Sequence, residues 1–361
     1  MQLFLPRRLL FVWCILVPAL VPAQQALPSA SVDPAYAAYI AGPSLHGTIR
    51  IAKSTAMETL LDYWMADFSR LYPEVRFERI PIRGNSPGAE LTTGQVDIGP
   101  LARELPPDEV TTFANAFGYP PTAIRVAGGS YKTPDKALAI AFLVNSANPI
   151  ARLTFAQIDA IYANHRPPAI PEAHTWGDLG LTGEWKNRPI HIWGLVRPGE
   201  SAHIQVSGNI TRFLSERVLG GSEFRDDIGE RTTVGAKVSA FEAIAEQVAK
   251  DPEALGYGGF NNVIPGTKAL AIGEAEKGPF YTGTFEEVAS QRYPLSRVVY
   301  FYLNQRPGEK VPAALMEFVK FVLSRDGQQD VSREGIFLPL PYRFAQQDLV
   351  MLREREGKRQ P

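Results

Sequence analysis

Apolar and polar residues alternate along the chain with two different periods. Residues 48–52 (TIRIA) and 75–80 (VRFERI) alternate as in strands with one buried face. Residues 137–145 (ALAIAFLVN) are apolar enough for a strand that is covered on both faces. Between the first two strands, apolar residues recur at the spacing of a helix with one buried stripe, at Met57, Leu60, Leu61, Trp64, Met65, Phe68 and Leu71. Strand, helix and strand in succession predict an α/β fold.

The second half of the chain continues the same alternation of strands and helices. Thr154, with Gln157 three residues later, is a capping box that predicts the start of a helix. Further strands are expected at 96–99, 188–196 and 297–304, and further helices at 153–162, 206–218, 238–248 and 315–323. A chain of 361 residues without a visible repeat predicts two lobes or domains.

The first 23 residues have the pattern of an export signal. Arg7 and Arg8 precede an apolar run from Leu9 to Val21, and small residues follow as far as Ala23. A membrane anchor needs about 20 apolar residues, and this run is shorter and contains Pro18. We therefore expect cleavage and a periplasmic location, with residues 1–23 as signal peptide. Residues 24–45, rich in Ala, Pro and Ser, are expected to form a leader without regular structure.

Charge and composition exclude several kinds of partner. The formal net charge is −1, and removal of Arg7 and Arg8 lowers it by two, to −3, with no long run of one sign. This argues against a nucleic-acid or anionic-membrane partner. The single cysteine, Cys14, follows bulky Trp13 inside the signal, so a lipoprotein is not favoured and the mature chain has no disulfide.

Histidine spacing gives no sign of a metal centre. The five histidines are scattered without a pair four residues apart, at His46, His165, His174, His191 and His203. A metal receptor is therefore not favoured, and no metal or other cofactor is expected.

Three turns share an arrangement suited to an anion. In residues 51–58, 82–91 and 194–205, an apolar strand enters a turn with small and hydroxyl-bearing residues, which then opens a helix. A helix start leaves about four backbone N–H groups unpaired and carries partial positive charge, so converging starts form an anion site. Each turn also has an ordinary interpretation: Thr55 with Glu58 is a capping box, and Ser86 before Pro87 suits a plain turn.

The third turn, RPGESAH at 197–203, has two competing interpretations. Its GESAH resembles the nucleophile elbow of a serine hydrolase, but His203 stands where the elbow has its final glycine, and no glycine-rich oxyanion segment is present. Arg197 supplies a planar fork of donors that suits a tetrahedral oxyanion. An anion clamp is therefore favoured, and we expect no enzyme activity and no catalytic residue.

The order of these motifs resembles the phosphate-binding family of ABC-transporter solute receptors. The resemblance runs from about Gly47 to Leu340 and is carried by residues 53–77, 84–104, 148–164, 175–179, 197–203, 254–260, 293–304 and 318–341. It implies a two-lobed periplasmic binding protein-like (type II) fold, each lobe a sheet flanked by helices. On that resemblance, lobe 1 comprises 46–137 and 306–345, lobe 2 comprises 138–305, and residues 346–361 form a C-terminal tail.

The resemblance also implies the site and its partners. The ligand-binding residues it assigns are Ser54, Thr55, Ala56, Asn85, Ser86, Arg197, Ser201, Ala202 and His203. The implied ligand is phosphate or a similar oxyanion, the implied partner is an ABC permease in the inner membrane, and we expect a monomer.

The anion turns depart from the family pattern. The family's third loop usually reads Arg-x-x-Gly-Ser-Gly-Thr, whereas Glu200, Ala202 and His203 replace the two glycines and the threonine here. The second loop is one residue short, and Ala102-Arg103 stands where the family has Ser-Arg or an acidic contact. These departures leave open an alternative, a receptor-like sensor or partner-binding protein with altered or lost phosphate binding.

Overall fold

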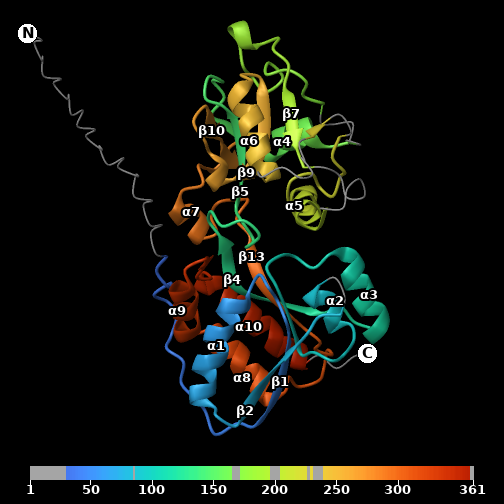
Figure 1. Cartoon of the computed structure of the whole chain (residues 1–361), viewed down its shortest axis with the longest axis vertical. Helices are drawn as coiled ribbons and strands as arrows, with labels where there is room; N and C mark the ends of the chain where they lie inside the picture. Colours follow the sequence, from blue (N-terminus) through green and yellow to red (C-terminus); the bar gives the residue numbers. More distant parts are fainter. Residues whose placement is uncertain are drawn as a thin grey trace, which may run out of the picture.

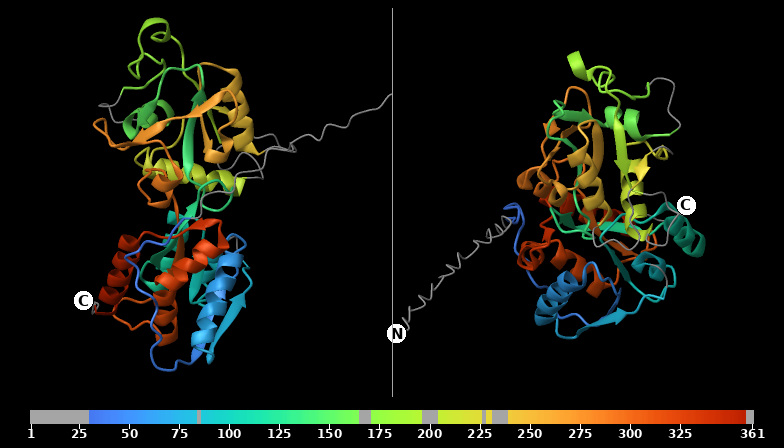
Figure 2. Two further views of the ribbon diagram at one scale, coloured as in Figure 1. Left: turned by 90° about the vertical axis from the view of Figure 1, so that its left-hand side faces the viewer. Right: turned by 45° about the horizontal axis from the view of Figure 1, so that its top comes forward.

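The chain forms two lobes joined by a few crossing segments, as Figures 1 and 2 show. The computed structural model describes residues 30–83, 86–164, 171–195, 204–225, 228–230 and 239–357. The predicted signal peptide lies outside these residues. Within them, no helix combines the length and the apolar character that a bilayer span requires.

Lobe 1, the lower lobe in Figure 1, is built on a six-stranded sheet in the order β14-β4-β13-β3-β1-β2. Its strands are β1 (Gly47–Ala52), β2 (Val75–Ile80), β3 (Ile98–Leu101), β4 (Thr122–Ser130), β13 (Val298–Leu303) and β14 (Phe337–Leu338). Strand β1 pairs in parallel with β2 and β3, while β13 is antiparallel to β3 and β4. The sheet is therefore mixed, with parallel pairs on one side and antiparallel pairs on the other.

The helices of lobe 1 come from both halves of the sequence. They are α1 (Glu58–Leu71), α2 (Pro87–Leu91), α3 (Pro107–Phe117), α8 (Ala313–Val322), α9 (Arg325–Glu334) and α10 (Tyr342–Gly357). The predicted stripe of α1 is confirmed at Trp64 and Phe68, which are fully buried, but Leu71 is 44% exposed. Trp64 packs edge-on against Phe301 of β13, with ring centroids 5.5 Å apart. The early helix and the late strand thus share one core.

Lobe 2 is built on a five-stranded sheet in the order β10-β5-β9-β7-β8, with a three-stranded sheet β12-β11-β6 beside it. The strands are β5 (Ile140–Asn145), β6 (Arg152–Thr154), β7 (His191–Gly194), β8 (Gly229–Glu230), β9 (Ala254–Gly259), β10 (Thr267–Ala269), β11 (Ala271–Gly273) and β12 (Phe280–Tyr281). Every residue of β5 is buried, as its unbroken apolar run predicts.

Three helices of lobe 2 lie where the periodicity predicts them, and a short fourth, α7 (Phe285–Ala289), was not predicted. The three are α4 (Phe155–Tyr162), α5 (Ile204–Arg217) and α6 (Ala240–Lys250), with 3₁₀ turns at Gly183–Trp185 and Phe260–Asn262. The capping box of Thr154 and Gln157 at the start of α4 is confirmed, with both reciprocal hydrogen bonds present.

The structure differs from the predicted lobe boundaries in three places. Strand β13 pairs within the sheet of lobe 1, so lobe 2 ends near residue 296 and not at 305. Part of the expected leader packs on lobe 1, where Tyr36 is buried and donates to the Leu340 carbonyl over 3.0 Å. The expected tail continues helix α10, and its Leu352 is fully buried. Local periodicity identifies an element but does not say which sheet or core it joins.

Two segments connect the lobes and are hydrogen-bonded to each other. The Gly129 amide donates to the Arg297 carbonyl over 2.7 Å, and the Ile140 amide donates to the Leu295 carbonyl over 3.2 Å. Gly129 is needed here, because a β-carbon on it would lie 2.0 Å from the Ala137 carbonyl oxygen. The lobes are thus joined by a narrow, paired crossing, visible where β4, β5 and β13 meet in Figure 1.

Candidate anion-binding site

Three parallel strands of lobe 1 end at one edge of its sheet. The Lys53 amide continues the pairing of β1 with β2 by donating to the Ile80 carbonyl over 2.8 Å, and Ile51 is in register with Ile98 of β3. The turns that follow β1, β2 and β3 therefore lie side by side. This brings two of the predicted anion turns together, the one with Ser54, Thr55 and Ala56 and the one with Ser86.

The first turn keeps backbone donors free. Helix α1 has Met57 as its N-cap without a side-chain cap, so the capping box expected for Thr55 and Glu58 is wrong. Met57 instead donates its amide to the Ser54 carbonyl over 3.1 Å, which tightens the turn. Within the described part of the chain, the amides of Thr55 and Ala56 and the Thr55 hydroxyl make no hydrogen bond. These are the donors that an anion at a helix start requires.

The carbonyl groups of the first turn are held by Lys136. Its Nζ donates to the Ala56 carbonyl over 2.6 Å and lies 3.4 Å from the Thr55 carbonyl oxygen. Lys136 lies in the crossing segment between β4 and β5, flanked by Asp135 and Ala137 with φ values of 60° and 51°. Residues other than glycine rarely adopt this left-handed backbone conformation, which costs on the order of 1–3 kcal/mol for each residue. No local pattern marks Lys136 in the sequence, because its partners are backbone atoms about 80 residues earlier.

The side chain of Ser86 makes its hydrogen bonds within lobe 1. Its side chain caps α2 by accepting the Ala89 amide over 3.0 Å, and its hydroxyl donates to Glu109 Oε2 over 2.6 Å. Glu109 is in turn paired with Arg103 over 2.9 Å. The turn interpretation of Ser86 is therefore confirmed, and a ligand contact by its hydroxyl requires the bond to Glu109 to open. The neighbouring candidate Asn85 lies outside the described residues.

The third turn is bounded by described elements of lobe 2. Strand β7 ends at Gly194, the Leu195 amide donates to the Tyr257 hydroxyl over 3.0 Å, and helix α5 begins at Ile204. Burial raises the pKa of Tyr257, which stays a neutral hydroxyl. The strand before this segment and the helix after it are where the sequence predicts them. Arg197, Ser201, Ala202 and His203 lie outside the described residues, so their assignment stays a prediction.

Helix α5 faces the edge of lobe 1 at which the other two turns lie. Arg103 and Glu104, which follow β3, and Arg212 and Phe213 of α5 line one small pocket of about 10 Å³, together with Asn209 and Glu216. This volume holds about one water molecule. Burial raises the pKa of the Glu216 carboxyl, nearby Arg212 lowers it, and Glu104 adds to the rise. The contact shows that the helix opened by the third turn lies against the ends of the lobe 1 strands.

Arg297 lies at the junction of the two lobes and was not predicted. Its guanidinium pairs with Glu104 over 2.9 Å and lies 5.0 Å from the ring centroid of Phe213, while the residue is only 5% exposed. Arg103 and Arg297 therefore each have a carboxylate partner in this structure. Its place directly before the apolar run of β13 is the sequence signal that marks the position.

Another pocket on lobe 1 is lined by none of the residues of these turns. It measures about 230 Å³ and is lined by Gly42, Tyr72, Met316 and neighbouring residues on lobe 1. None of the predicted site residues lines it, so its size alone does not make it the ligand site.

The chain is similar to known binding proteins over most of its length. The family model described as a PBP superfamily domain matches residues 39–326. The phosphate-binding protein PstS of Pseudomonas aeruginosa, strains PAO1 and UCBPP-PA14, is 30% identical over 324 residues, which are 90% of this chain and 92% of the relative. The solved structure of PstS from Borrelia burgdorferi has 18% identity and a TM-score of 0.52, covering 82% of this chain and 99% of that one.

These similarities confirm the predicted fold class, a two-lobed type II arrangement of sheets flanked by helices. They agree with the resemblance that the motifs indicated, because the match spans both lobes and the crossing segments. The chain belongs to the PBP superfamily and, within it, to the family of the phosphate-binding protein PstS.

Proposed function

We propose that this chain is an extracytoplasmic receptor that binds phosphate between its two lobes and delivers it to an ABC uptake permease. The observation that carries the proposal is the 30% identity, over 90% of the chain, to a protein named for binding phosphate. Its place in a family of binding proteins supports binding rather than catalysis. Cleavage of residues 1–23 would release the mature chain into the periplasm. We expect the mature chain to be a monomer.

The lobe 1 turns support this chemistry with neutral donors. The free amides of Thr55 and Ala56 and the exposed Thr55 hydroxyl offer hydrogen bonds without adding charge. Arg103 and Arg297 are already balanced by Glu109 and Glu104, so these two arginines add little net positive charge to the junction. Arg197 in the third turn would then supply the main charge-assisted contact, in a bidentate geometry suited to an oxyanion. Hinge closure of the two lobes would complete the site.

Selectivity for phosphate depends on an acceptor in the site. Monohydrogen phosphate carries a proton that must be accepted, whereas sulfate carries none and is repelled by an unpaired carboxylate. A buried acceptor left without a donor costs about 1–3 kcal/mol. Glu200, which replaces a family glycine in the third turn, is the candidate acceptor on sequence grounds.

The test is calorimetry of the purified chain with phosphate and with sulfate at two pH values. We expect phosphate to bind with one site and sulfate to bind at least tenfold more weakly. Arg197→Ala should abolish phosphate binding while the far-ultraviolet circular dichroism stays unchanged. Arg188→Ala is the matched control, because Arg188 lies in the same lobe but pairs with Glu184 and covers the Trp185 ring. Unchanged affinity in Arg197→Ala would refute the clamp.

The alternatives give different outcomes in the same assay. A sensor or partner-binding protein that has lost its ligand shows no heat with phosphate, sulfate, arsenate, molybdate or tungstate in a folded chain. A serine hydrolase that uses Ser201 and His203 turns over a phosphate or carboxylate ester, and Ser201→Ala abolishes that turnover.

A further inference from the structure

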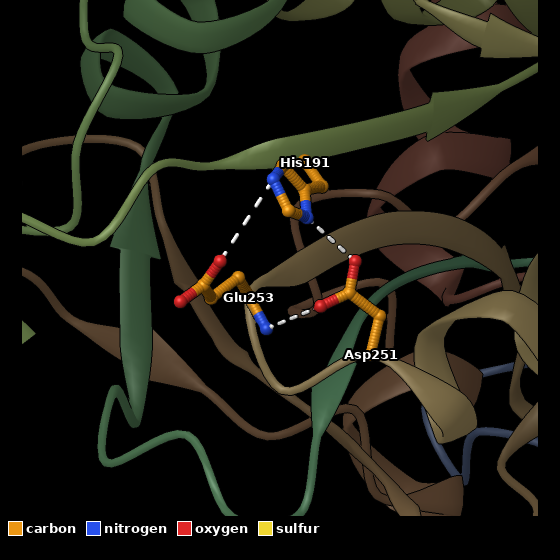
Figure 3. A group of neighbouring side chains, drawn as sticks. All are labelled: His191, Asp251 and Glu253. Atoms are coloured by element: carbon orange, nitrogen blue, oxygen red, sulfur yellow. Dashed lines mark hydrogen bonds and ion pairs between the residues drawn. The ribbon is translucent and has the colours of Figure 1, made fainter.

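A histidine and two carboxylates meet at the outer end of the lobe 2 sheet. His191 begins β7, Asp251 follows the last residue of α6, and Glu253 precedes β9 (Figure 3). Strands β7 and β9 are parallel, with His191 in register with Ala254. The third anion turn follows the other end of β7, so the two features lie at opposite ends of the same strand.

The hydrogen bonds of Asp251 fix the orientation of the imidazole ring. Its Oδ2 lies 2.6 Å from His191 Nδ1, and its Oδ1 accepts the Glu253 amide over 2.9 Å. Because an ionised carboxylate only accepts hydrogen bonds, the proton of this contact belongs to Nδ1. In the neutral imidazole, Nε2 then presents its lone pair.

That lone pair faces the second carboxylate at a distance suited to a shared ion. His191 Nε2 and Glu253 Oε2 are 3.8 Å apart, too far for a hydrogen bond. Two ligand atoms bound to one zinc ion at its usual bond lengths are about 3 to 4 Å apart. One ligand atom from each of the three residues falls within 4.8 Å of the others. The geometry therefore matches a known arrangement, in which a carboxylate hydrogen-bonds to one ring nitrogen of a histidine and the other ring nitrogen binds the metal. Here Asp251 is the carboxylate that orients the ring.

The backbone holds this arrangement in place without a metal. The His191 amide donates to the Glu253 carbonyl over 3.0 Å, and the Ala254 amide donates to the Asp251 carbonyl over 3.1 Å. The three side chains therefore leave from strand ends and a helix end that are bonded to one another. A site that is largely preformed loses little conformational freedom when an ion binds.

The charges of the cluster favour a cation. Among the described residues, neither Asp251 nor Glu253 forms an ion pair with a lysine or arginine, so with neutral histidine the cluster has two uncompensated negative charges. Asp251 also lies at the C-terminal end of α6, the negative end of the helix dipole. The His191 side chain is 48% exposed, which leaves room for water ligands.

We propose that His191 and Glu253 bind a divalent transition-metal ion of the zinc class, with Asp251 as the positioning residue on Nδ1. The ion would link the starts of β7 and β9 at the face of lobe 2 remote from the anion turns. This inference is independent of the proposed phosphate binding. The sequence alone did not reveal the site, because the ligands come from segments 60 residues apart.

The test is calorimetric titration of zinc chloride into the full chain, purified without a polyhistidine tag in phosphate-free buffer. We expect one equivalent to bind to the wild type, and His191→Ala and Glu253→Gln each to remove that equivalent. Asp251→Asn should retain binding with 10- to 100-fold lower affinity, the usual effect of losing an orienting partner. In the ¹⁵N spectrum of the imidazole, zinc should shift Nε2 and leave the Nδ1 proton in place.

The matched control is His174→Ala. His174 lies in the same lobe and pairs with a carboxylate, Glu172, over 3.0 Å, with a similarly exposed side chain. It should leave zinc binding unchanged, and His191→Ala should leave phosphate binding unchanged. Retention of the zinc equivalent in His191→Ala or Glu253→Gln would overturn the proposal, as would a zinc-induced shift at Nδ1 in place of Nε2.

Discussion

The two lobes are assembled from the chain in different ways. Lobe 2 is one continuous segment from about residue 138 to residue 296, whereas lobe 1 combines residues 30–130 with residues 298–357. Within lobe 1, Tyr36 bonds to Leu340 and Trp64 Nε1 donates to the Gly327 carbonyl over 2.7 Å, across 304 and 263 residues. In lobe 2, the Tyr293 hydroxyl reaches the Ile140 carbonyl across 153 residues.

The difference in sequence separation affects the order in which the two lobes fold more than it affects their stability. Doubling the length of a closed loop costs only about 0.6 kcal/mol, so the longer separations in lobe 1 have little thermodynamic effect. Contacts of high sequence separation do slow folding, however. Lobe 2 can therefore form before the chain is complete, whereas the lobe 1 anion turns depend on α8, α9 and α10 at its end.

The largest expected effect is at the contact of α10 with the sheet of lobe 1. Asp348 accepts the Arg125 amide over 2.7 Å and pairs with its guanidinium over 2.6 Å, and its side chain is 8% exposed. Asp348→Ala leaves the Arg125 amide without this acceptor and removes the ion pair, and should lower the free energy of unfolding by about 3 kcal/mol, measured by urea denaturation.

Gln347→Ala is the control for that variant. It removes only an exposed hydrogen bond to the same arginine, and should change stability by less than about 0.5 kcal/mol. Equal effects of the two substitutions would show that α10 does not hold lobe 1 together.

A smaller loss of stability is expected when either of two buried tryptophans, one in each lobe, is replaced by phenylalanine. Trp64 and Trp176 are both 0% exposed. Trp64 donates to Gly327, whereas Trp176 Nε1 is buried and has no hydrogen-bond partner among the described residues. Trp64→Phe creates space and removes the indole hydrogen bond to Gly327, so it should cost about 2 kcal/mol. Trp176→Phe removes an unsatisfied donor, which offsets part of the loss of volume. We therefore expect Trp176→Phe to lower the Tm less than Trp64→Phe does. A larger drop in Tm for Trp176→Phe would contradict this reasoning.

The smallest effect is a pH dependence that belongs to lobe 1. Burial, with the neighbouring charge of Asp67, raises the pKa of Asp330 to about 7 against the lowering effect of Arg333, and Asp326 adds to the rise. The folded state then holds this proton more tightly than the unfolded state, so stability falls as pH rises from about 4 to about 7. Asp330→Asn should reduce the fall in Tm between pH 5 and pH 8.

The control for the pH experiment lies in lobe 2. Glu246 forms an exposed pair with Lys250, and Glu246→Gln should leave the same Tm difference unchanged. An identical pH profile in wild type and Asp330→Asn would show that Asp330 does not carry this dependence.

The sequence predicted local elements well and their assembly less well. Residues 48–52 and 75–80 were identified as strands because a half-buried strand must alternate, and the first two anion turns follow from where those strands end. Periodicity did not assign β13 to lobe 1, because strands of either sheet are equally apolar. The partners of Ser86, Thr55 and Ala56 were also missed. Glu109 and Lys136 lie 23 and about 80 residues away, where no local pattern connects them.

The position of Arg297 has a consequence for movement of the lobes. Its guanidinium is fixed to lobe 1 by an ion pair with Glu104, and its contact with lobe 2 is the flat face of the Phe213 ring. Attraction between a cation and a ring face persists while the ring slides within about 6 Å, unlike a directional hydrogen bond. Movement of the Phe213 ring across this guanidinium therefore breaks no hydrogen bond between the two side chains, and Arg297 can keep its contact with both lobes as they rotate.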